Sequence, residues 1–336
     1  MVVSNNELTG CPTGLTTGRK GSAMTTTTPI IVDRSTTWNA IGKTVDQCKD
    51  LQSVLTTSGL DYTVEKHPVF AQPTVGKFAK IPNRFVTVRT NDHHMYDVVS
   101  DKFEIVQNRD AFDFVAYMGE DLQFEKAGET AGGMVYIIAK LPEVNILGDA
   151  FTPHVIFRNG FTGKIKITAA ICPLRIICQN QFNFAFKDTQ NAITVRHVQN
   201  AQAKLEEAKQ VLKMSADYMA ELSRMAEHYA GIKLSEKELD WAINWMFPTI
   251  GIEEMNAFKR HQLEQSIEAF KKAYNADDNG NFRGTAWGLI NAYTDFITHK
   301  VPTGNSATKF EGRFMKVTFN QTGMNKILTV IDRLAA

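Results

Sequence analysis

The chain has few of the residues that build a metal centre or a disulfide framework. Four of its 336 residues are cysteines, Cys11, Cys48, Cys172 and Cys178. They form no CxxC pair, and none stands at a zinc-ligand spacing from a histidine. We therefore expect no metal and no other cofactor. Cys172 and Cys178 are expected to be small core residues in a reducing cytoplasm.

Long apolar runs and a surplus of one charge are also missing. No stretch approaches the ~18 apolar residues of a membrane-spanning helix, and the first residues show neither a signal-peptide core nor a transit-peptide pattern. These absences predict a cytoplasmic protein with no membrane partner. The 37 basic and 36 acidic residues give a net charge of +1. That balance excludes a uniformly basic nucleic-acid binder but allows a local basic patch.

No familiar catalytic signature is present. The chain contains no GxSxG, P-loop or HExxH motif, and no GxGxxG between a strand and a helix, so we predict that it is not an enzyme. Two stretches imitate metal sites. Adjacent His93 and His94 point to opposite faces, and the calcium-like run from Asn275 has Ala286 where the bidentate Glu belongs. We interpret both stretches as turns.

The first half of the chain alternates between apolar and polar residues, as strands do. Strands are predicted over residues 62–70, 84–90, 96–99, 103–106, 122–127, 134–141, 164–171 and 174–178. Hairpin tips are predicted at residues 91–94 and 132–133. Helices are predicted over residues 38–55, ended by Gly59, and over residues 110–118. The expected fold class is α+β, with a largely antiparallel sheet and interspersed helices.

The second half has helical periodicity. From Val198 to Tyr229, apolar and small residues recur at spacings of three and four, which predicts one long helix. Its apolar seam packs either on its own chain or against another copy. Ser235 and Glu238 form a capping box that begins a helix ended by Pro248. Further helices are predicted over residues 261–274, 284–299 and 322–334.

The chain is long enough for one large domain or for two. Residues 1–35 are rich in Thr, Gly and Ser, which predicts a flexible N-terminal arm. Residues 36–197 are expected to form the α+β sheet domain. Residues 198–336 are expected to form a helical region packed on that domain.

The stretch from residue 154 to residue 197 carries isolated cations within apolar strands and only one acid, Asp188. A purely structural sheet would normally intersperse acids. We therefore predict a nucleic-acid-binding surface, with phosphates on the cations and unpaired bases stacked on aromatic rings. The residues assigned to this surface are Arg158, Lys164, Lys166, Arg175, Lys187, Arg196, Phe161 and Phe184.

The aromatic part of this surface has two interpretations. Phe182, Phe184 and Phe186 alternate along one predicted strand and so share a face, which is either core or a platform for base stacking.

A structural motif accompanies the surface, formed by Asn159, Gly160, Cys178 and Asn180. The Asn-Gly pair predicts a tight turn with positive φ. The asparagine at the exit of the last strand predicts a hydrogen bond to neighbouring backbone.

Several stretches together carry a family resemblance. FRNGFTGKIKI begins at Phe157, and PLRIICQN ends at Asn180. With TTWNAIG, SGLDYTVEKHPVF, YDVVSDKFEIVQNRDAFDF and GTAWGLINAYTDFITHK, they resemble the phage/plasmid-like protein family known as domain of unknown function 932. The similarity covers most of residues 36–300. The family's common His-Asp-Gly turn is Arg158-Asn159-Gly160 here, so no metal or acid–base role is carried over to it.

The resemblance implies a mobile genetic element in a bacterial host, and it implies no assigned function. The leading hypothesis is a phage- or plasmid-encoded accessory protein of DNA metabolism that binds single-stranded DNA, as a recombination mediator or annealing protein. The alternative is an interaction protein that counteracts a host defence system, and a metal-free hydrolase or nuclease comes third.

A homo-oligomer is also expected, through helix 198–229 or the N-terminal arm, because a helix of ~48 Å exceeds the span of a compact domain.

Overall fold

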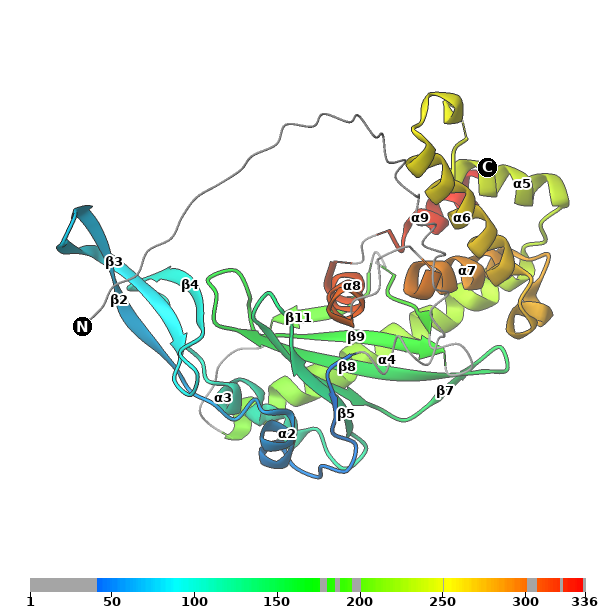
Figure 1. The fold of residues 1–336 in the computed structure, drawn as a ribbon. Coiled ribbons are helices and arrows are strands. Elements are labelled where there is room, and N and C mark those ends of the chain that lie inside the picture. The colour runs from blue at the N-terminus through cyan, green and yellow to red at the C-terminus, as the bar shows by residue number, and fades with distance from the viewer. Residues whose placement is uncertain are drawn as a thin grey trace, which may run out of the picture. The chain divides into compact units, whose positions relative to one another are not determined.

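Antiparallel strands form most of the first half of the chain and helices most of the second, which confirms the predicted α+β class (Figure 1). This is a computed structural model, and it describes residues 41–175, 180–184, 188–194, 201–249, 251–300, 307–320 and 323–334. All of them belong to one compact unit, residues 31–336. The predicted N-terminal arm, residues 1–35, lies outside the described residues.

The main sheet has the strand order β1-β5-β6-β8-β9-β10, with β11 paired to β9 and β7 paired to β8. All its pairings are antiparallel. The strands are β1 Lys43–Thr44, β5 Gln123–Glu129, β6 Met134–Lys140, β7 Val144–Ile146, β8 Asp149–Gly160, β9 Thr168–Arg175, β10 Asn180–Gln181 and β11 Ala192–Thr194. The central strands β6, β8 and β9 are buried along most of their length, because helices cover both of their faces.

A second, smaller sheet has the order β2-β3-β4, formed by β2 Val64–Thr74, β3 Lys77–Arg89 and β4 Met95–Ser100. The predicted hairpin tip at residues 91–94 is confirmed between β3 and β4. The strand predicted over residues 103–106 is wrong. The Gln107 side chain accepts from the Val64 amide at 3.0 Å and donates to the Val64 carbonyl at 2.9 Å, so it occupies the backbone groups that another strand would pair.

The described helices are α2 Leu51–Ser58, α3 Asn108–Phe112, α4 Ala201–Gly231, α5 Glu236–Met246, α6 Ala257–Tyr274, α7 Ala286–Asp295, α8 Ala307–Asn320 and α9 Lys326–Leu334. Side-chain caps begin four of the helices, α2, α5, α6 and α7, in the part of the chain that the structure describes. Short turns of 3₁₀ helix follow at Asp113–Tyr117, Ile252–Glu254 and Asp277–Phe282, with a π-helical turn at Phe296–Lys300. The predicted capping box of Ser235 and Glu238 is confirmed. The helix predicted from residue 38 begins only at Leu51, because Asp50 caps it, and Gly59 ends it in the left-handed conformation.

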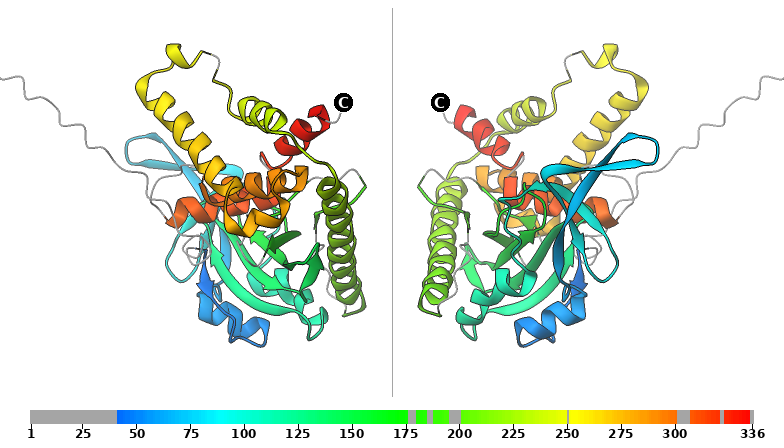
Figure 2. Two further views of the ribbon diagram at one scale, coloured as in Figure 1. Left: turned by 90° about the vertical axis from the view of Figure 1, so that its right-hand side faces the viewer. Right: turned by 90° about the vertical axis from the view of Figure 1, so that its left-hand side faces the viewer.

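Opposite faces of the main sheet are covered by different helices (Figure 2). On β6, Ile137 belongs to the core that includes residues of α4, whereas its neighbours Tyr136 and Ile138 belong to a core with Phe314 and Met315 of α8. Successive residues of a strand point to opposite faces, so β6 contributes side chains to a hydrophobic layer on each face of the sheet. No helix was predicted from the sequence over the residues of α8.

The long helix α4 joins the sheet to the helical half of the chain. Its Val211 and Tyr218 pack in the sheet core, and its Leu222 and Ala226 pack with α5, α6, α7 and α9 in a second core. Of the predicted seam, Ala208, Leu222 and Ala226 are buried within their own chain, Val198 lies outside the described residues, and the homo-oligomer stays a prediction. No described helix is both long enough and apolar enough to cross a membrane.

Candidate nucleic-acid interface

The predicted surface of residues 154–197 does not form one patch. Arg158 lies opposite Thr168 at one end of the β8–β9 pair, and Arg175 lies opposite Phe151 at the other. The two positions are seven residues apart along β8, roughly 24 Å at about 3.4 Å per residue. The prediction that these cations share one solvent-reachable surface is wrong.

Arg175 is a buried structural residue, 1% exposed. Its Nη2 lies 2.6 Å from the Asp149 carboxylate and donates to the carbonyl of Asp278 at 2.6 Å. The guanidinium therefore ties the main sheet to the 3₁₀ turn at Asp277–Phe282. A buried cation needs such partners, and here they leave no free donor face for a phosphate.

Lys164 and Lys166 are exposed but lie in the loop between β8 and β9, not in a strand. The Lys164 ammonium is 3.6 Å from the Asp97 carboxylate on β4, which places this loop beside the small sheet. Three further assigned residues, Lys187, Arg196 and Cys178, lie outside the described residues.

The assigned aromatic residues are core. Phe161, Phe182 and Phe184 are all fully buried. The Phe182 ring packs edge-on against that of Phe151, with centroids 5.0 Å apart, and the Phe184 amide donates to the Tyr218 hydroxyl at 2.7 Å. A ring inside the core cannot stack a base, so the core interpretation holds for Phe161, Phe182 and Phe184, and Phe186 lies outside the described residues.

The structural motif has a different basis from the one predicted. Asn159 and Gly160 end β8, opposite Val135 and Met134, instead of forming a turn with positive φ. A Cβ on Gly160 would lie 2.6 Å from the Cβ of Ile165, so the position demands glycine for close packing. The buried Asn159 amide donates to the Val106 carbonyl and to the Asn108 side chain. Asn180 lies in β10, and its side chain lies outside what the structure describes.

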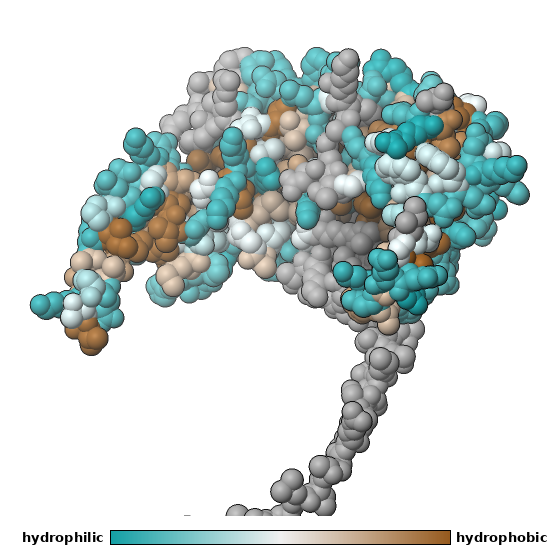
Figure 3. All heavy atoms as spheres, turned by 90° about the horizontal axis from the view of Figure 1, so that it is seen from above, coloured by the Kyte–Doolittle hydropathy of each residue, from teal (hydrophilic) through white to brown (hydrophobic). Residues whose placement is uncertain are grey.

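The exposed aromatic and cationic side chains lie instead on the hairpin formed by β2 and β3. Between Phe70 and Lys80 the two strands pair only with each other, because β4 reaches no further along β3 than Arg84. Every residue from Phe70 to Lys80 is exposed. We call residues 68–85 the ribbon. Figure 3 shows hydrophobic residues among hydrophilic ones on this part of the surface.

The ribbon combines aromatic rings with cations. Phe70 is 54% exposed and Phe78 is 72% exposed. Phe70 lies opposite Lys80, and alternate residues of a strand share a face, so Phe78 and Lys80 project on the same side as Phe70. Lys77 and Arg84 add two further cations, and no Asp or Glu occurs between residues 68 and 91.

The backbone of the ribbon is built against continued sheet pairing. Pro68, Pro73 and Pro82 have no amide N–H to donate, and the β2–β3 register shifts after Pro68 and again after Ala71. Asn83 adopts a positive φ of 56° within β3. Prolines and bulges on exposed strands prevent edge-to-edge aggregation. A ribbon with both faces in solvent has little packing of its own, so its exposed rings are available to a ligand.

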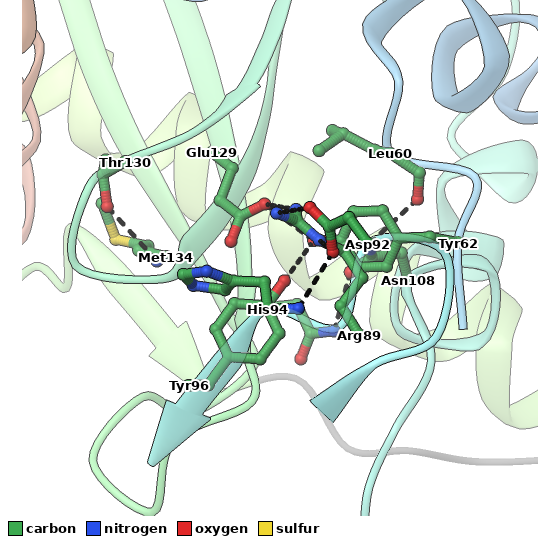
Figure 4. A network of polar contacts seen from close by, with 11 residues as sticks. Leu60, Tyr62, Arg89, Asp92, His94, Tyr96, Asn108, Glu129, Thr130 and Met134 are labelled. Atoms are coloured by element: carbon green, nitrogen blue, oxygen red, sulfur yellow. Dashed lines mark hydrogen bonds and ion pairs between the residues drawn. The ribbon is translucent and has the colours of Figure 1, made fainter. Parts of the chain in front are cut away.

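A polar network anchors the small sheet, from which the ribbon extends (Figure 4). The Arg89 guanidinium forms two hydrogen bonds to Asp92, at 2.9 and 2.8 Å, and one to Glu129 at 2.7 Å. The Tyr62 hydroxyl donates to the same Glu129 oxygen at 2.9 Å, and the Tyr96 hydroxyl donates to Tyr62 at 3.0 Å. These contacts join the small sheet to β5 of the main sheet.

The pKa shifts in this network fix its protonation state at neutral pH. Burial raises the pKa of Tyr62 to about 12 and is also the main reason that the pKa of Tyr96 rises. The hydrogen bonds between Arg89 and Asp92 raise the pKa of the arginine and lower the pKa of the carboxyl. The pKa values of both tyrosines are therefore further above pH 7 than usual, and the pKa of Asp92 is further below it. The network is therefore suited to holding the two sheets together and not to transferring protons.

The sequence does carry a signal for the ribbon, namely three cations and no acid from residue 68 to residue 85. Among the residues that the structure describes, no group of His, Cys, Asp or Glu side chains could hold a metal ion. The calcium-like run is an ordinary turn, in which the buried Asn279 amide donates to the carbonyls of Tyr274 and Gly288.

The chain belongs to the family described as domain of unknown function (DUF932), whose match covers residues 95–322. The match begins at the first residue of β4 and so contains β8, β9 and α8 but neither strand of the ribbon. No curated protein gives a significant match. No solved structure does so either.

Proposed function

We propose that the protein binds single-stranded nucleic acid along the ribbon, as a cytoplasmic accessory protein of phage or plasmid DNA metabolism, of the recombination-mediator or annealing type. The observation that carries this proposal is the exposure of Phe70 and Phe78 beside Lys80 on one side of a ribbon that holds no acid.

Each part of the ribbon matches one part of a nucleotide. Cations attract the phosphates and release counterions, which makes binding sensitive to salt. An exposed aromatic ring stacks on an unpaired base, which contributes about 1–3 kcal/mol per base. Bases in a duplex are already stacked on each other, so two exposed rings favour a single strand.

The test is fluorescence anisotropy with a labelled oligo-dT and a duplex of equal length. Phe70→Ser with Phe78→Ser should weaken binding of the single strand at least tenfold, because two stacking contacts are lost. Lys77→Gln with Lys80→Gln should weaken binding and reduce the salt slope by roughly 1.4, at about 0.7 for each of two phosphate contacts on a single strand.

Two matched controls separate the ribbon from the rest of the surface. Phe258→Ser removes an aromatic ring on α6 that is 69% exposed, and Lys237→Gln removes an exposed cation on α5. Both should bind as the unaltered protein does. Equal binding by the ribbon variants, or tighter binding of the duplex than of the single strand, contradicts the proposal.

The second candidate is a protein partner, such as a component of a host defence system. The outer face of the small sheet favours it, because Met95 is 67% exposed and Val98 is 51% exposed. Val98 lies opposite the partly exposed Val86 on β3, and Met95 lies opposite Val88, which is itself buried. An apolar interface would hold its partner at moderate salt, whereas nucleic-acid binding would weaken steeply. Met95→Ser with Val98→Ser tests this face without altering the ribbon.

A further inference from the structure

A groove of about 350 Å³ lies between α8 and the β5–β6 turn, away from the ribbon's own residues. Gly132 of the turn forms one side, Lys316 and Phe319 of α8 form the other, and Arg158 of β8 lines it as well. No acidic side chain is among the described residues that line it. The volume is at the lower end of the range for small-molecule sites.

Arg158 is an unusual residue for a sheet. It is half-buried, and its Nε is buried without a hydrogen-bond partner among the described residues. Its guanidinium lies over the Phe319 ring, 4.0 Å from the centroid, which orients the charge but satisfies none of its N–H groups. Burial lowers the pKa of Arg158, and no neighbouring carboxylate opposes this effect.

The nearest acidic side chain on α8 is otherwise engaged. Glu311 is buried and accepts a hydrogen bond from the hydroxyl of Tyr136, the residue opposite Arg158 in the ladder. Arg175, the other arginine of this strand pair, has the carboxylate that a buried cation requires. Arg158 therefore differs from Arg175 in having no carboxylate partner among the described residues, and the groove is where an anion can reach it.

We propose that this groove binds a phosphate monoester, with the Arg158 guanidinium and the Lys316 ammonium as its two cationic ligands. A guanidinium presents paired N–H donors that match two phosphate oxygens, and an ammonium supplies a mobile third contact. The phosphate comes either from a free nucleotide or from the 5′ end of a strand. The site stands independently of the ribbon, because it shares no residue with it.

The experiment measures binding of inorganic phosphate and dTMP to the full chain in low-salt chloride buffer, by thermal shift and by calorimetry. Both ligands should raise the unfolding temperature, and thymidine should not. Arg158→Met should weaken dTMP binding at least tenfold. Because a buried cation without an anion costs stability, this variant should unfold no earlier than the unaltered protein.

Further variants keep the test decisive if Arg158→Met folds poorly. Lys316→Gln removes an exposed side chain of the groove and should also weaken dTMP binding, whereas Lys164→Gln in the β8–β9 loop should not. The Phe70→Ser, Phe78→Ser variant should bind dTMP normally, so failure of the ribbon proposal leaves this one intact.

A comparison of 5′-phosphorylated and 5′-hydroxyl oligo-dT identifies the source of the phosphate. A gain from the 5′ phosphate that Arg158→Met abolishes assigns the groove to strand ends, and dTMP binding without that gain assigns it to free nucleotides. Absence of any response to millimolar phosphate and dTMP overturns the proposal. Unchanged dTMP binding in both Arg158→Met and Lys316→Gln overturns it equally.

Discussion

Arg89 on β3 and Glu129 at the end of β5 form an ion pair across the two sheets, with Nη1 and Oε2 2.7 Å apart. Their side chains are 19% and 15% exposed. The pair is therefore only partly open to water, and screening by solvent reduces it less than it would a surface pair. The same arginine lies over the rings of Tyr62 and Tyr96, at 4.8 and 5.7 Å from their centroids.

Replacing Arg89 should loosen the small sheet before it affects the main one. Arg89→Met leaves the Glu129 carboxylate with a hydrogen bond from Tyr62 only, and we expect a loss of about 1–3 kcal/mol in the free energy of unfolding. Amide hydrogen exchange should accelerate in β2, β3 and β4 while β8 and β9 keep their protection.

Arg109→Met is the matched control for this prediction. Arg109 pairs with Asp61 at 3.2 Å, but these side chains are 62% and 39% exposed, so the loss should be about 0–1 kcal/mol. Equal exchange throughout the small sheet in the Arg89 variant and in the unaltered protein would show that the ion pair does not anchor it.

Replacing Arg175 should lower the stability of the fold, whereas replacing Lys166 should leave it almost unchanged, although the sequence predicted one surface for both. Arg175→Met leaves the partly buried Asp149 carboxylate, 20% exposed, without its cation and the Asp278 carbonyl without its donor, and should cost about 1–3 kcal/mol of unfolding free energy. Lys166→Met alters an exposed loop side chain and should change stability by less than about 0.5 kcal/mol. Urea denaturation measures both. Similar stabilities for the two variants would contradict the structural role of Arg175.

Features encoded by local chemistry could be predicted from the sequence. The heptad-like seam gave the long helix α4, Ser235 and Glu238 gave the start of α5, and the β5–β6 hairpin was found from its two strands and glycines. In each, the residues that determine the structure are near neighbours in the chain, so periodicity and capping rules suffice.

The partners of a buried charge could not be predicted in this way. Arg175 bonds to Asp149, 26 residues away, and to the Asp278 carbonyl, 103 residues away. No spacing rule relates such distant positions, so a cation with a buried partner looks the same in the sequence as one that faces a ligand.

The ribbon was missed for a different physical reason. Period-two alternation marks a strand that buries one face, and a ribbon with both faces in solvent has no such constraint. The strands predicted over residues 62–70 and 84–90 are correct in place, but Pro73, Gly76 and Pro82 interrupt the apolar pattern between them. The structure continues both strands through that gap.

Glu311 should make stability depend on pH. Burial raises its pKa, while hydrogen bonds from Tyr136 and the Gly42 amide oppose the shift only in part. The folded state therefore keeps this proton longer than the unfolded chain does, so stability falls as pH rises from about 4.5 toward the higher pKa of the folded state. Glu311→Gln should gain stability relative to the unaltered protein at pH 7 but not at pH 4. A difference independent of pH, in urea denaturation at both values, would contradict this.

The last prediction concerns Gly160, where close packing and not backbone conformation demands glycine. An added Cβ would lie 2.6 Å from Cβ and 2.7 Å from Cγ2 of Ile165, closer than side-chain atoms approach each other. Gly160→Ala should therefore cost about 1–3 kcal/mol through overpacking. Gly163→Ala, in the loop that follows, is the control, because no atom lies within 4 Å of its added Cβ.

A second substitution separates packing from backbone strain at this position. Ile165→Gly removes all three atoms that a Cβ on residue 160 would meet, namely Cβ, Cγ2 and Cδ1 of Ile165, so the Gly160→Ala, Ile165→Gly variant should be more stable than the sum of the two single losses predicts. Additive losses would place the strain in the backbone of residue 160 and contradict the packing argument. A double-mutant cycle by thermal and urea unfolding distinguishes the two causes. The cycle therefore measures how closely the β8–β9 loop, through Ile165, packs against the end of β8, the strand that carries Arg158.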